Sequence, residues 1–419
     1  MKNLFKKIII ERQEWFDSIK IINRDISIEN HANYSFTGLR RAGKSYVLYQ
    51  IIKRIISTQQ IENILFINFE DERLLEVNSN HLQLILDAYH ELFTFKPIIF
   101  LDEIQNVQNW QKFVRRLVDM GLQVYITGSN AQMLSHEIAT TLGGRFINKE
   151  ISTLSFQEFL RFKDIDFTKL SKFKKERFEI MSAYDEYLIF GGFPELIKFK
   201  NKREFLSSVY QKLFYGDIIS RYNIANATML KLILKKLAES VNNETSVNRI
   251  KNIIKSIGLK VGNNTVFEYL SYLEHSYLIG SISNYHKKIS EKESNKKYYF
   301  MDNGILSLFL IDQDTKLLEN EIYLQLRRKN YDIYFLKQQT EVDFYIPEEN
   351  LLIQVSYDIS DTETFKRETK ALRKAMKHFQ IDEGLIITKD SSKLGTETLD
   401  VSEGKLFIKS AWEWLLEIN

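Results

Sequence analysis

The chain has 419 residues, more than a single hydrophobic core usually organises, so two or three domains are expected. Hydrophobic residues make up 44% and aromatic residues 13% of the sequence, a composition typical of folded globular proteins. The absence of cysteine excludes disulfides, thiolate-bound zinc and thiol catalysis. The net charge is only +3, but residues 151–300 contain 25 Lys and Arg against 16 Asp and Glu. This basic middle fits either polyanion binding or ordinary solvated helix faces.

The amino-terminal residues predict a helix and no membrane anchor. No run of 18 apolar residues is present, so no transmembrane helix is expected. The apolar run at residues 8–10 is too short for the core of a signal peptide, and we expect a cytoplasmic protein. An amphipathic helix over residues 8–22 is expected within an N-terminal segment of residues 1–30.

From residue 34 to residue 152, short apolar runs alternate with helical patterns. Continuous apolar strands separated by helices predict a parallel sheet covered by helices on both faces. Residues 31–152 are therefore expected to form an α/β core. Its expected strands are residues 34–37, 64–69, 98–101, 124–127 and 146–151.

The first of these strands leads into Gly-Leu-Arg-Arg-Ala-Gly-Lys-Ser, residues 38–45, and then into an apolar helix. A G-x-x-x-x-G-K-S run between a strand and a helix is the pattern of a phosphate-binding loop, whose backbone N–H groups point at phosphate oxygens. Lys44 is expected to reach the β- and γ-phosphates, and the Ser45 hydroxyl to bind Mg²⁺. The loop predicts binding of a nucleoside triphosphate, with contacts from Gly38, Arg41, Ala42, Gly43, Lys44, Ser45 and Tyr46.

The strand at 98–101 ends in two adjacent acids, Asp102 and Glu103. They follow the carboxyl end of the strand, which is where proteins with parallel sheets place their ligands. Asp102 is expected to hold Mg²⁺ together with Ser45, and Glu103 to polarise the attacking water. The two acids therefore predict ATP hydrolysis.

Polar residues after the later strands complete the predicted site. Asn130 is the expected sensor of the γ-phosphate or of water, with Ser129 as the second choice. Residues 69–71 either line the same sheet edge or form a plain polar strand end. Arg145 follows a Leu-Gly-Gly run and either stabilises transition-state charge, on the same or a neighbouring protomer, or forms a structural ion pair.

The basic middle predicts helices followed by a two-stranded wing. Residues 153–228 have a helical pattern expected for a lid, and residues 229–301 have the outline of a winged helix-turn-helix. Its candidate recognition helix, residues 264–273, carries Glu268 but no Lys or Arg, which makes it a poor DNA reader by charge. Either nearby lysines contact DNA, or the wing serves protein contacts or lid movement. The lysines are Lys251, Lys255, Lys260, Lys287, Lys288, Lys292, Lys296 and Lys297.

Together these motifs resemble the AAA_14-type P-loop ATPase domain of a widespread prokaryotic family. The resemblance rests on residues 38–45, on Ile-Ile-Phe-Leu-Asp-Glu-Ile-Gln, Ile-Thr-Gly-Ser-Asn and Leu-Gly-Gly-Arg-Phe, and on Gly-Gly-Phe-Pro-Glu at residues 191–195. Residues 302–419 are similar to the DUF4143 domain of that family. The resemblance implies an ATP-binding α/β core, a helical lid, a winged helix and a C-terminal fold like that of restriction-type nucleases. It also gives Pro194 the role of contacting the nucleotide from the lid.

Nucleases of the implied type hold Mg²⁺ with acids and use a lysine to help activate water. The matching residues are Glu321 on a predicted helix over residues 320–329 and Asp343 on a predicted strand over residues 342–346. On the next strand Gln354 replaces an acid and Ser356 replaces the lysine. Fewer carboxylates bind Mg²⁺ less well and serine carries no positive charge, so a nuclease-like fold without nuclease activity is expected. Glu368 and Lys370 are alternative sources of the missing groups.

The sequence thus predicts a Mg²⁺-dependent ATPase with a P-loop sheet, a helical lid, a winged-helix region and a nuclease-like α/β domain. Its nucleotide state is expected to move the last two parts, with DNA as the target. The alternative is a nucleotide-dependent signalling or assembly switch that binds protein partners with little turnover, and an active nuclease ranks third. An oligomer is compatible with either. The expected domains are residues 1–30, 31–152, 153–228, 229–301 and 302–419.

Overall fold

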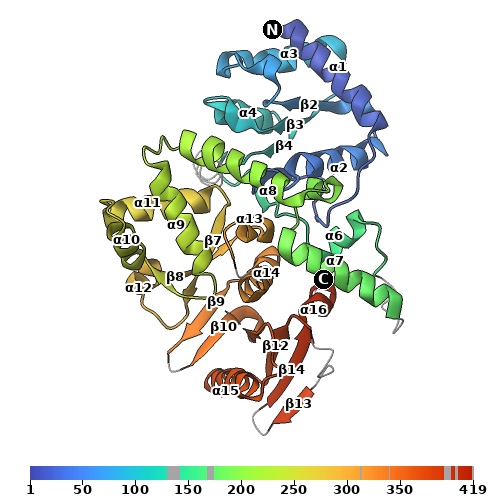
Figure 1. Ribbon diagram of the computed structural model, residues 1–419. Coiled ribbons are helices and arrows are strands. Elements are labelled where there is room, and N and C mark those ends of the chain that lie inside the picture. The colour runs from blue at the N-terminus through green and yellow to red at the C-terminus, as the bar shows by residue number, and fades with distance from the viewer. Residues whose placement is uncertain are drawn as a thin grey trace. The chain divides into compact units, whose positions relative to one another are not determined.

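The computed structural model describes residues 1–129, 142–167, 174–311, 314–338, 340–390, 398–401 and 404–417 (Figure 1). The chain divides into two compact units. The first consists of Met1–Ser152 with His275–Tyr277, and the second of Thr153–Glu274 with Leu278–Asn419. The domain boundaries expected at residues 30, 152, 228 and 301 remain predictions.

The first unit is built on a sheet of five parallel strands in the order β2-β3-β4-β1-β5. This confirms the predicted parallel α/β sheet. Because all strands run the same way, their carboxyl ends meet at one edge, which is where the P-loop and the acidic pair begin. The strands are β1 (Asn33–Thr37), β2 (Ile64–Asn68), β3 (Ile98–Asp102), β4 (Gln123–Thr127) and β5 (Phe146–Glu150).

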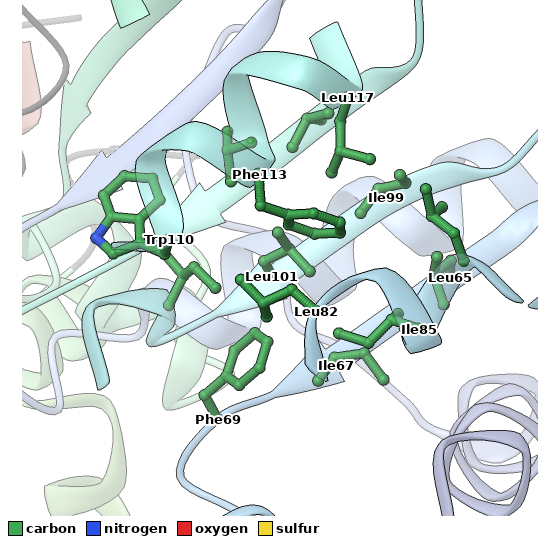
Figure 2. Packing of buried hydrophobic residues seen from close by; sticks show 14 of the residues in the cluster. Leu65, Ile67, Phe69, Leu82, Ile85, Ile99, Leu101, Trp110, Phe113 and Leu117 are labelled. Carbon is green, nitrogen blue, oxygen red and sulfur yellow. The ribbon is translucent and has the colours of Figure 1, made fainter. Parts of the chain in front are cut away.

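Helices cover both faces of this sheet, and two hydrophobic cores result. Alternate residues of a strand point to opposite faces, so Leu101 of β3 joins one core and Phe100 joins the other. Figure 2 shows the first core, in which Leu101 lies among Trp110, Phe113 and other buried side chains. The covering helices are α1 (Lys2–Ser18), α2 (Lys44–Ile56), α3 (Gln83–Leu92) and α4 (Trp110–Asp119), and the short helices η1 (Ile61–Asn63), η2 (Glu72–Leu74), η3 (Ser79–His81) and η4 (Ile104–Asn106) lie in the connections.

The amino-terminal helix α1 is part of this core. It begins at Lys2 and ends at Ser18, earlier than the expected range of residues 8–22. Phe5 and Ile8 join the first core, and Phe16 joins the second. Helical spacing places these apolar residues on a broad buried face, so α1 is packed against the P-loop sheet.

The second unit begins with helices that match the expected helical pattern. The helices expected within residues 229–301 are α9 (Ala227–Glu239), α10 (Val247–Ser256) and α11 (Asn263–His275). None of the helices in the described part of the chain is long and apolar enough to cross a membrane. The elements before α9 are α6 (Phe156–Phe162), α7 (Lys174–Phe190), η6 (Pro194–Lys198), α8 (Lys202–Gln211) and the π-helix η7 (Lys212–Ser220).

A mixed nine-stranded sheet in the order β13-β14-β12-β11-β10-β9-β7-β8-β6 runs through the second unit. The expected wing strands, β7 (Ile279–Asn284) and β8 (Asn295–Phe300), belong to the same sheet as the C-terminal strands. The link is a parallel pair between β7 and β9 (Tyr334–Lys337), in which the Tyr285 N–H donates to the Phe335 carbonyl at 3.0 Å. This pairing satisfies backbone N–H and C=O groups of β7 that would stay unpaired at the edge of an isolated wing. The winged helix and the nuclease-like fold remain predictions.

The other elements of the second unit include several that the sequence pattern did not predict. Helix α12 (Ile289–Ser294) lies between the two wing strands, and α14 (Asp314–Arg328) begins earlier than the helix expected over residues 320–329. The rest are β6 (Thr245–Ser246), α13 (Asn303–Ser307), β10 (Glu341–Ile346), η8 (Pro347–Glu349), β11 (Leu351–Val355), α15 (Thr362–Phe379), β12 (Glu383–Thr388), β13 (Thr398–Val401), β14 (Gly404–Ser410) and α16 (Ala411–Glu417).

The Gly-Gly pair that precedes Pro194 is explained by a buried carboxylate. Asp302 accepts hydrogen bonds from the Gly192 N–H at 2.9 Å and the Gly304 N–H at 2.8 Å. Burial raises the pKa of Asp302 to about 6, and these hydrogen bonds oppose the rise. Gly191 has φ +74°, and a Cβ there would lie 2.1 Å from Asp302 Oδ1. The motif is therefore required for packing within the second unit.

We expect Gly191→Ala to lower the free energy of unfolding by about 2–4 kcal/mol, because left-handed strain adds to overpacking against a fixed carboxylate. Gly258→Ala is the matched control, since Gly258 also has a left-handed φ of +86° but open space around its Cβ position. It should cost only about 1 kcal/mol, the strain alone. Denaturant unfolding measures both, and equal losses would contradict the role of Asp302.

Candidate functional site

The loop at residues 38–45 has the backbone that a phosphate-binding loop requires. Gly38 has φ +140° and Gly43 has φ +101°, values that side chains rarely allow. A Cβ on Gly38 would lie 2.2 Å from the carbonyl oxygen of Ile151, so the loop is pressed against the chain that follows β5. Arg41 also has a positive φ, +63°. Helix α2 then begins at Lys44, which places its positive end at the loop.

Lys44 is buried inside its own loop. Its side chain is only 3% exposed, and Nζ donates to the carbonyls of Gly38 at 3.1 Å and Leu39 at 3.2 Å. Glu103 Oε1 lies 3.8 Å from the same nitrogen. The ammonium group is thus held between the loop and the acidic pair, the position from which it can reach a phosphate bound to the loop.

Asp102 is fully buried at the end of β3 and is held by two hydroxyl groups. Ser45 Oγ donates to Asp102 Oδ1 at 3.1 Å, and Thr127 Oγ1 donates to the same oxygen at 2.5 Å. Thr127 Oγ1 also accepts from the Glu103 N–H at 2.9 Å. Burial, together with the negative charge of Glu103, raises the pKa of Asp102 to about 6. Its second oxygen, Oδ2, is buried and has no hydrogen-bond partner among the described residues.

These oxygen atoms fit a small divalent cation. Mg²⁺ takes oxygen ligands and usually keeps several waters, with one or two protein ligands and the substrate phosphates completing its shell. Asp102 and the adjacent Ser45 hydroxyl supply such a pair, and the unpartnered Oδ2 is an acceptor that lacks a positive partner. Among the described residues, no group of three or more His, Asp or Glu side chains forms a metal cage. The pair therefore suits Mg²⁺ only when phosphates supply further ligands.

Glu103 adopts an uncommon backbone conformation at this edge. Its φ is +52° and its ψ +42°, a left-handed conformation that costs a non-glycine residue about 1–2 kcal/mol. Strain of this kind tends to persist where function needs it. The side chain lies next to Lys44, and its Oε2 accepts a short hydrogen bond from the Gln105 amide. The conformation turns Glu103 from the sheet toward the loop lysine.

Two residues of this site were not predicted from the sequence. Thr127 lies one residue beyond the Leu101–Ile126 register pair, level with Asp102, and the matching strand ends were a usable signal. Arg24 donates from Nη1 to the Ala42 carbonyl at 2.8 Å and from Nη2 to the Ser152 carbonyl at 2.9 Å. It lies in an irregular segment after α1, where no pattern marks it. Arg24 braces the phosphate-binding loop from outside.

The other predicted residues of this edge have separate partners or lie elsewhere. Asn130 lies outside the described residues, and Ser129 is buried just after β4. Glu70 pairs with Arg40 at 2.7 Å, and Asp71 pairs with Arg73 at 2.8 Å. Both acids are thus engaged by arginines and not by the residues around Asp102. Tyr46, on the first turn of α2, is 51% exposed.

Arg145 is not brought to the acidic pair, and Pro194 belongs to the other unit. Arg145 precedes β5, and in a parallel sheet the strand starts lie at the edge opposite the P-loop. Its Nε donates to Asp119 Oδ1 at 2.9 Å. This contact is the structural ion pair that was one of the two interpretations of Arg145. It does not support a role for Arg145 at the phosphate-binding loop of the same chain. Pro194 belongs to the second unit, where it begins η6, and its nucleotide contact stays a prediction.

The predicted nuclease-like residues do not form one cluster. Glu321 pairs with Arg328 at 3.2 Å and accepts a hydrogen bond from Tyr187 at 3.2 Å, and burial raises its pKa to about 7. Gln354 donates to Glu368 at 2.8 Å, and Ser356 donates to the Asp358 carbonyl at 3.2 Å. Lys370 is exposed. Glu321 therefore has partners other than Asp343 among the described residues.

Asp343 instead belongs to a buried lysine cluster centred on Lys297. Lys297 Nζ lies 3.1 Å from Asp343, 3.2 Å from Glu341 and 3.4 Å from Glu319, and its side chain has no exposed surface. Burial by itself lowers the pKa of Lys297, but the three carboxylates outweigh it and the net shift is upward. Glu319, two residues before Glu321, faces the opposite side of α14. Lys297 was expected among the lysines available to DNA, and its burial corrects that expectation.

Comparison with known proteins assigns the first unit to a family. A model described as an AAA domain (AAA_14) matches residues 30–160, and a domain of unknown function (DUF8612) matches residues 181–316. The uncharacterized protein MJ1544 of Methanocaldococcus jannaschii is 36% identical over 428 residues, 99% of this chain and 96% of the relative. The chain belongs to the family of MJ1544. An uncharacterized protein of Haemophilus influenzae is 31% identical, over 78% of this chain and 82% of its own.

The family match confirms the expected AAA-type P-loop domain, whereas the resemblance to DUF4143 is not confirmed. Among solved structures, the Walker-type ATPase PABY2304 of Pyrococcus abyssi is 13% identical with a TM-score of 0.44, over 73% of this chain and 94% of that one. AMPPCP-bound DnaA of Aquifex aeolicus is 14% identical with a TM-score of 0.26, over 64% and 86%. These values are too low to transfer any function.

We expect Lys297→Met to lower the free energy of unfolding by about 3–5 kcal/mol, because it leaves buried carboxylates without their cation. The loss should shrink from pH 8 to pH 5. Burial raises the pKa of Glu319 to about 7, so this carboxylate becomes protonated and neutral at pH 5, while Lys297 stays charged in the wild type. With one negative charge fewer in the cluster, the loss of the lysine costs less stability. Lys296→Met is the control, since Lys296 makes a surface pair with Glu293 at 3.0 Å. Similar losses in both variants, or no dependence on pH, would refute the cluster's role.

Proposed function

We propose that this family member is a Mg²⁺-dependent ATPase. One observation carries the proposal: Lys44, Ser45, Asp102, Glu103 and Thr127 are connected by short contacts at the carboxyl edge of the sheet, beside the phosphate-binding loop. A loop without this group would bind a nucleotide but would lack a metal holder and a base. The family match of residues 30–160 to an AAA domain supports ATP as the ligand.

Each residue of this group has a distinct part in the proposed reaction. The backbone N–H groups of the loop and the Lys44 ammonium bind the phosphates, and Lys44 neutralises charge that develops on them. Ser45 and Asp102 would hold Mg²⁺, which when bound neutralises and orients the phosphates. Thr127 fixes the position of Asp102. Glu103 would accept a hydrogen bond from the attacking water and orient it toward the γ-phosphate.

The proposal extends to the second unit and its partners. Nucleotide state would alter the second unit, and DNA is the target we favour because residues 151–300 carry an excess of positive charge. Binding of protein partners and formation of an oligomer are compatible with this scheme. Nuclease activity is not proposed, because Asp343 is neutralised by Lys297 and Gln354 stands in place of an acid.

One observation favours a second candidate, a nucleotide-dependent switch with little turnover. The Glu103 carboxylate is already engaged by Lys44 and Gln105. If these contacts persist when ATP binds, Glu103 cannot orient water, and the protein would hold its nucleotide and signal through partners. Purified protein with a bound nucleotide and negligible turnover, with or without DNA, would favour the switch over the ATPase.

We expect Lys44→Ala and Glu103→Gln to separate binding from hydrolysis. Lys44→Ala should weaken ATP binding about 10–100-fold, since it removes a charged hydrogen-bond donor worth roughly 1.5–3 kcal/mol. Glu103→Gln should leave binding intact and lower turnover by about 10²–10⁴-fold, as expected for the loss of a general base. Calorimetry with ATP and a phosphate-release assay, each with and without DNA, make the two measurements. Full hydrolysis by Glu103→Gln would refute the role of Glu103.

We expect Thr127→Val to lower turnover about tenfold or more, because it removes the hydroxyl that joins Asp102 to the Glu103 backbone. Thr127→Ser is the matched control, since it keeps the hydroxyl and should retain most of the activity. Both variants must unfold at a similar denaturant concentration for the comparison to hold. Equal activity of the valine and serine variants would show that the hydroxyl is dispensable.

A further inference from the structure

A pocket in the second unit combines positive charge with aromatic rings. Its volume is about 340 Å³, within the range of small-ligand sites. Helices α8 and α9, the π-helix η7 and the two residues after α13 line it, and Figure 1 locates the three α-helices. The lining includes Arg203, Lys231, Lys235, Tyr210, Tyr215 and Phe309, and no Asp or Glu. The pocket therefore has the chemistry of an anion site with an apolar wall.

The three cations of this pocket are not neutralised by the described parts of the protein. None of Arg203, Lys231 and Lys235 has an ion-pair partner among the described residues, whereas the neighbouring Lys236 pairs with Glu239 at 3.5 Å. Lys231 and Lys235 are four residues apart on α9, a spacing at which like charges repel by about 0.2–0.5 kcal/mol. A bound anion would remove this repulsion.

The aromatic wall leaves one ring open to a ligand. The Tyr210 ring packs edge-on against Phe309, with centroids 5.2 Å apart, and its hydroxyl has no hydrogen-bond partner among the described residues. Tyr215 is 55% exposed, and its ring makes a T-shaped contact with Phe214, with centroids 5.1 Å apart. An exposed ring beside cations offers a stacking surface, and stacking on an aromatic ring is worth about 1–3 kcal/mol per nucleic-acid base.

The π-helix explains how Tyr215 reaches this pocket. Tyr210 lies on α8 and Tyr215, five residues later, lies on η7, which follows α8 without a break. In a continuous α-helix two residues with this spacing point about 140° apart around the axis. The wider turn of a π-helix reduces that angle, so both rings line one pocket. π-Helical turns are rare and occur often at functional sites.

We propose that this pocket binds one nucleotide unit of a single-stranded nucleic acid. Arg203, Lys231 and Lys235 would contact the phosphate, and the base would stack on Tyr215. Cations combined with stacking rings are how proteins bind single strands without reading sequence. The assignment rests on the proposed function in one respect, the choice of a nucleic acid as the target. It deepens that function by placing the contact on α8, η7 and α9 and not on the expected recognition helix.

The test measures anisotropy of a fluorescein-labelled oligo(dT) with the full chain. The double substitution Lys231→Ala with Lys235→Ala should weaken binding about tenfold or more and reduce the salt slope by about 0.7, since the pocket holds one phosphate and one phosphate contact contributes about 0.7 for a single strand. Tyr215→Ala should weaken binding about 5–150-fold without changing the salt slope, and Tyr215→Phe should restore it. The substituted side chains are exposed, so the fold should survive.

The matched control is Lys255→Ala with Lys260→Ala, which removes the same charge from a different surface of the second unit. It should weaken binding by less than threefold. Equal loss in both double variants would overturn the proposal in favour of general electrostatic attraction, and so would wild-type affinity in the pocket variants. Absence of oligonucleotide binding by the wild type would overturn it outright.

Competition with AMP distinguishes binding of a strand from binding of a free nucleotide. The experiment uses the Lys44→Ala variant, so that the phosphate-binding loop does not take up the AMP. Millimolar AMP should leave the oligonucleotide largely bound, and complete displacement by micromolar AMP would assign the pocket to free nucleotides and overturn the strand proposal. The measurement needs no hydrolysis. A strand-binding protein without turnover would refute only the ATPase, and an active ATPase that does not bind the strand would refute only this pocket.

Discussion

Burial of the Asp102 carboxylate is the constraint on which the arrangement of the first unit depends. A buried charge is unfavourable unless hydrogen bonds or an opposite charge compensate it. Here compensation comes from Ser45 at the start of α2 and from Thr127 at the end of β4. The phosphate-binding loop, β3 and β4 must therefore meet at one point. The parallel sheet meets this condition, because the strand ends that carry these residues lie at the same edge.

Buried charge also organises the second unit. Asp302 fixes the chain around Gly192 and Gly304, and Lys297 gathers acids from α14 and β10. In both places a charged atom is satisfied by groups distant in the sequence, which ties helices and strands into one body. Removal of Lys297 would leave buried carboxylates without a cation, and removal of Asp302 would leave buried N–H groups without an acceptor. The contacts of the motif at residues 191–195 are therefore structural. The same holds for the contacts of the nuclease-like positions.

Much of the first unit could be predicted from the sequence because its signals are local. Apolar runs of four to six residues predicted the five strands, and the spacing of glycine, lysine and serine predicted the loop before α2. Asp102 and Glu103 were identified because they directly follow a buried strand. Hydrophobic period and turn chemistry depend on neighbours in the sequence, so the chain alone specifies them.

Other features depended on contacts between distant residues. On α14, Glu319 and Glu321 are both acidic and buried, and only the packed helix decides that Glu319 meets Lys297 while Glu321 meets Arg328. Arg24 braces the loop from a segment without any pattern, and Tyr215 joins its pocket through a π-helical turn. The sequence by itself determined the parallel sheet, the phosphate-binding loop and its acids. The tertiary structure decided which charges pair, because pairing depends on distances in space that sequence spacing does not encode.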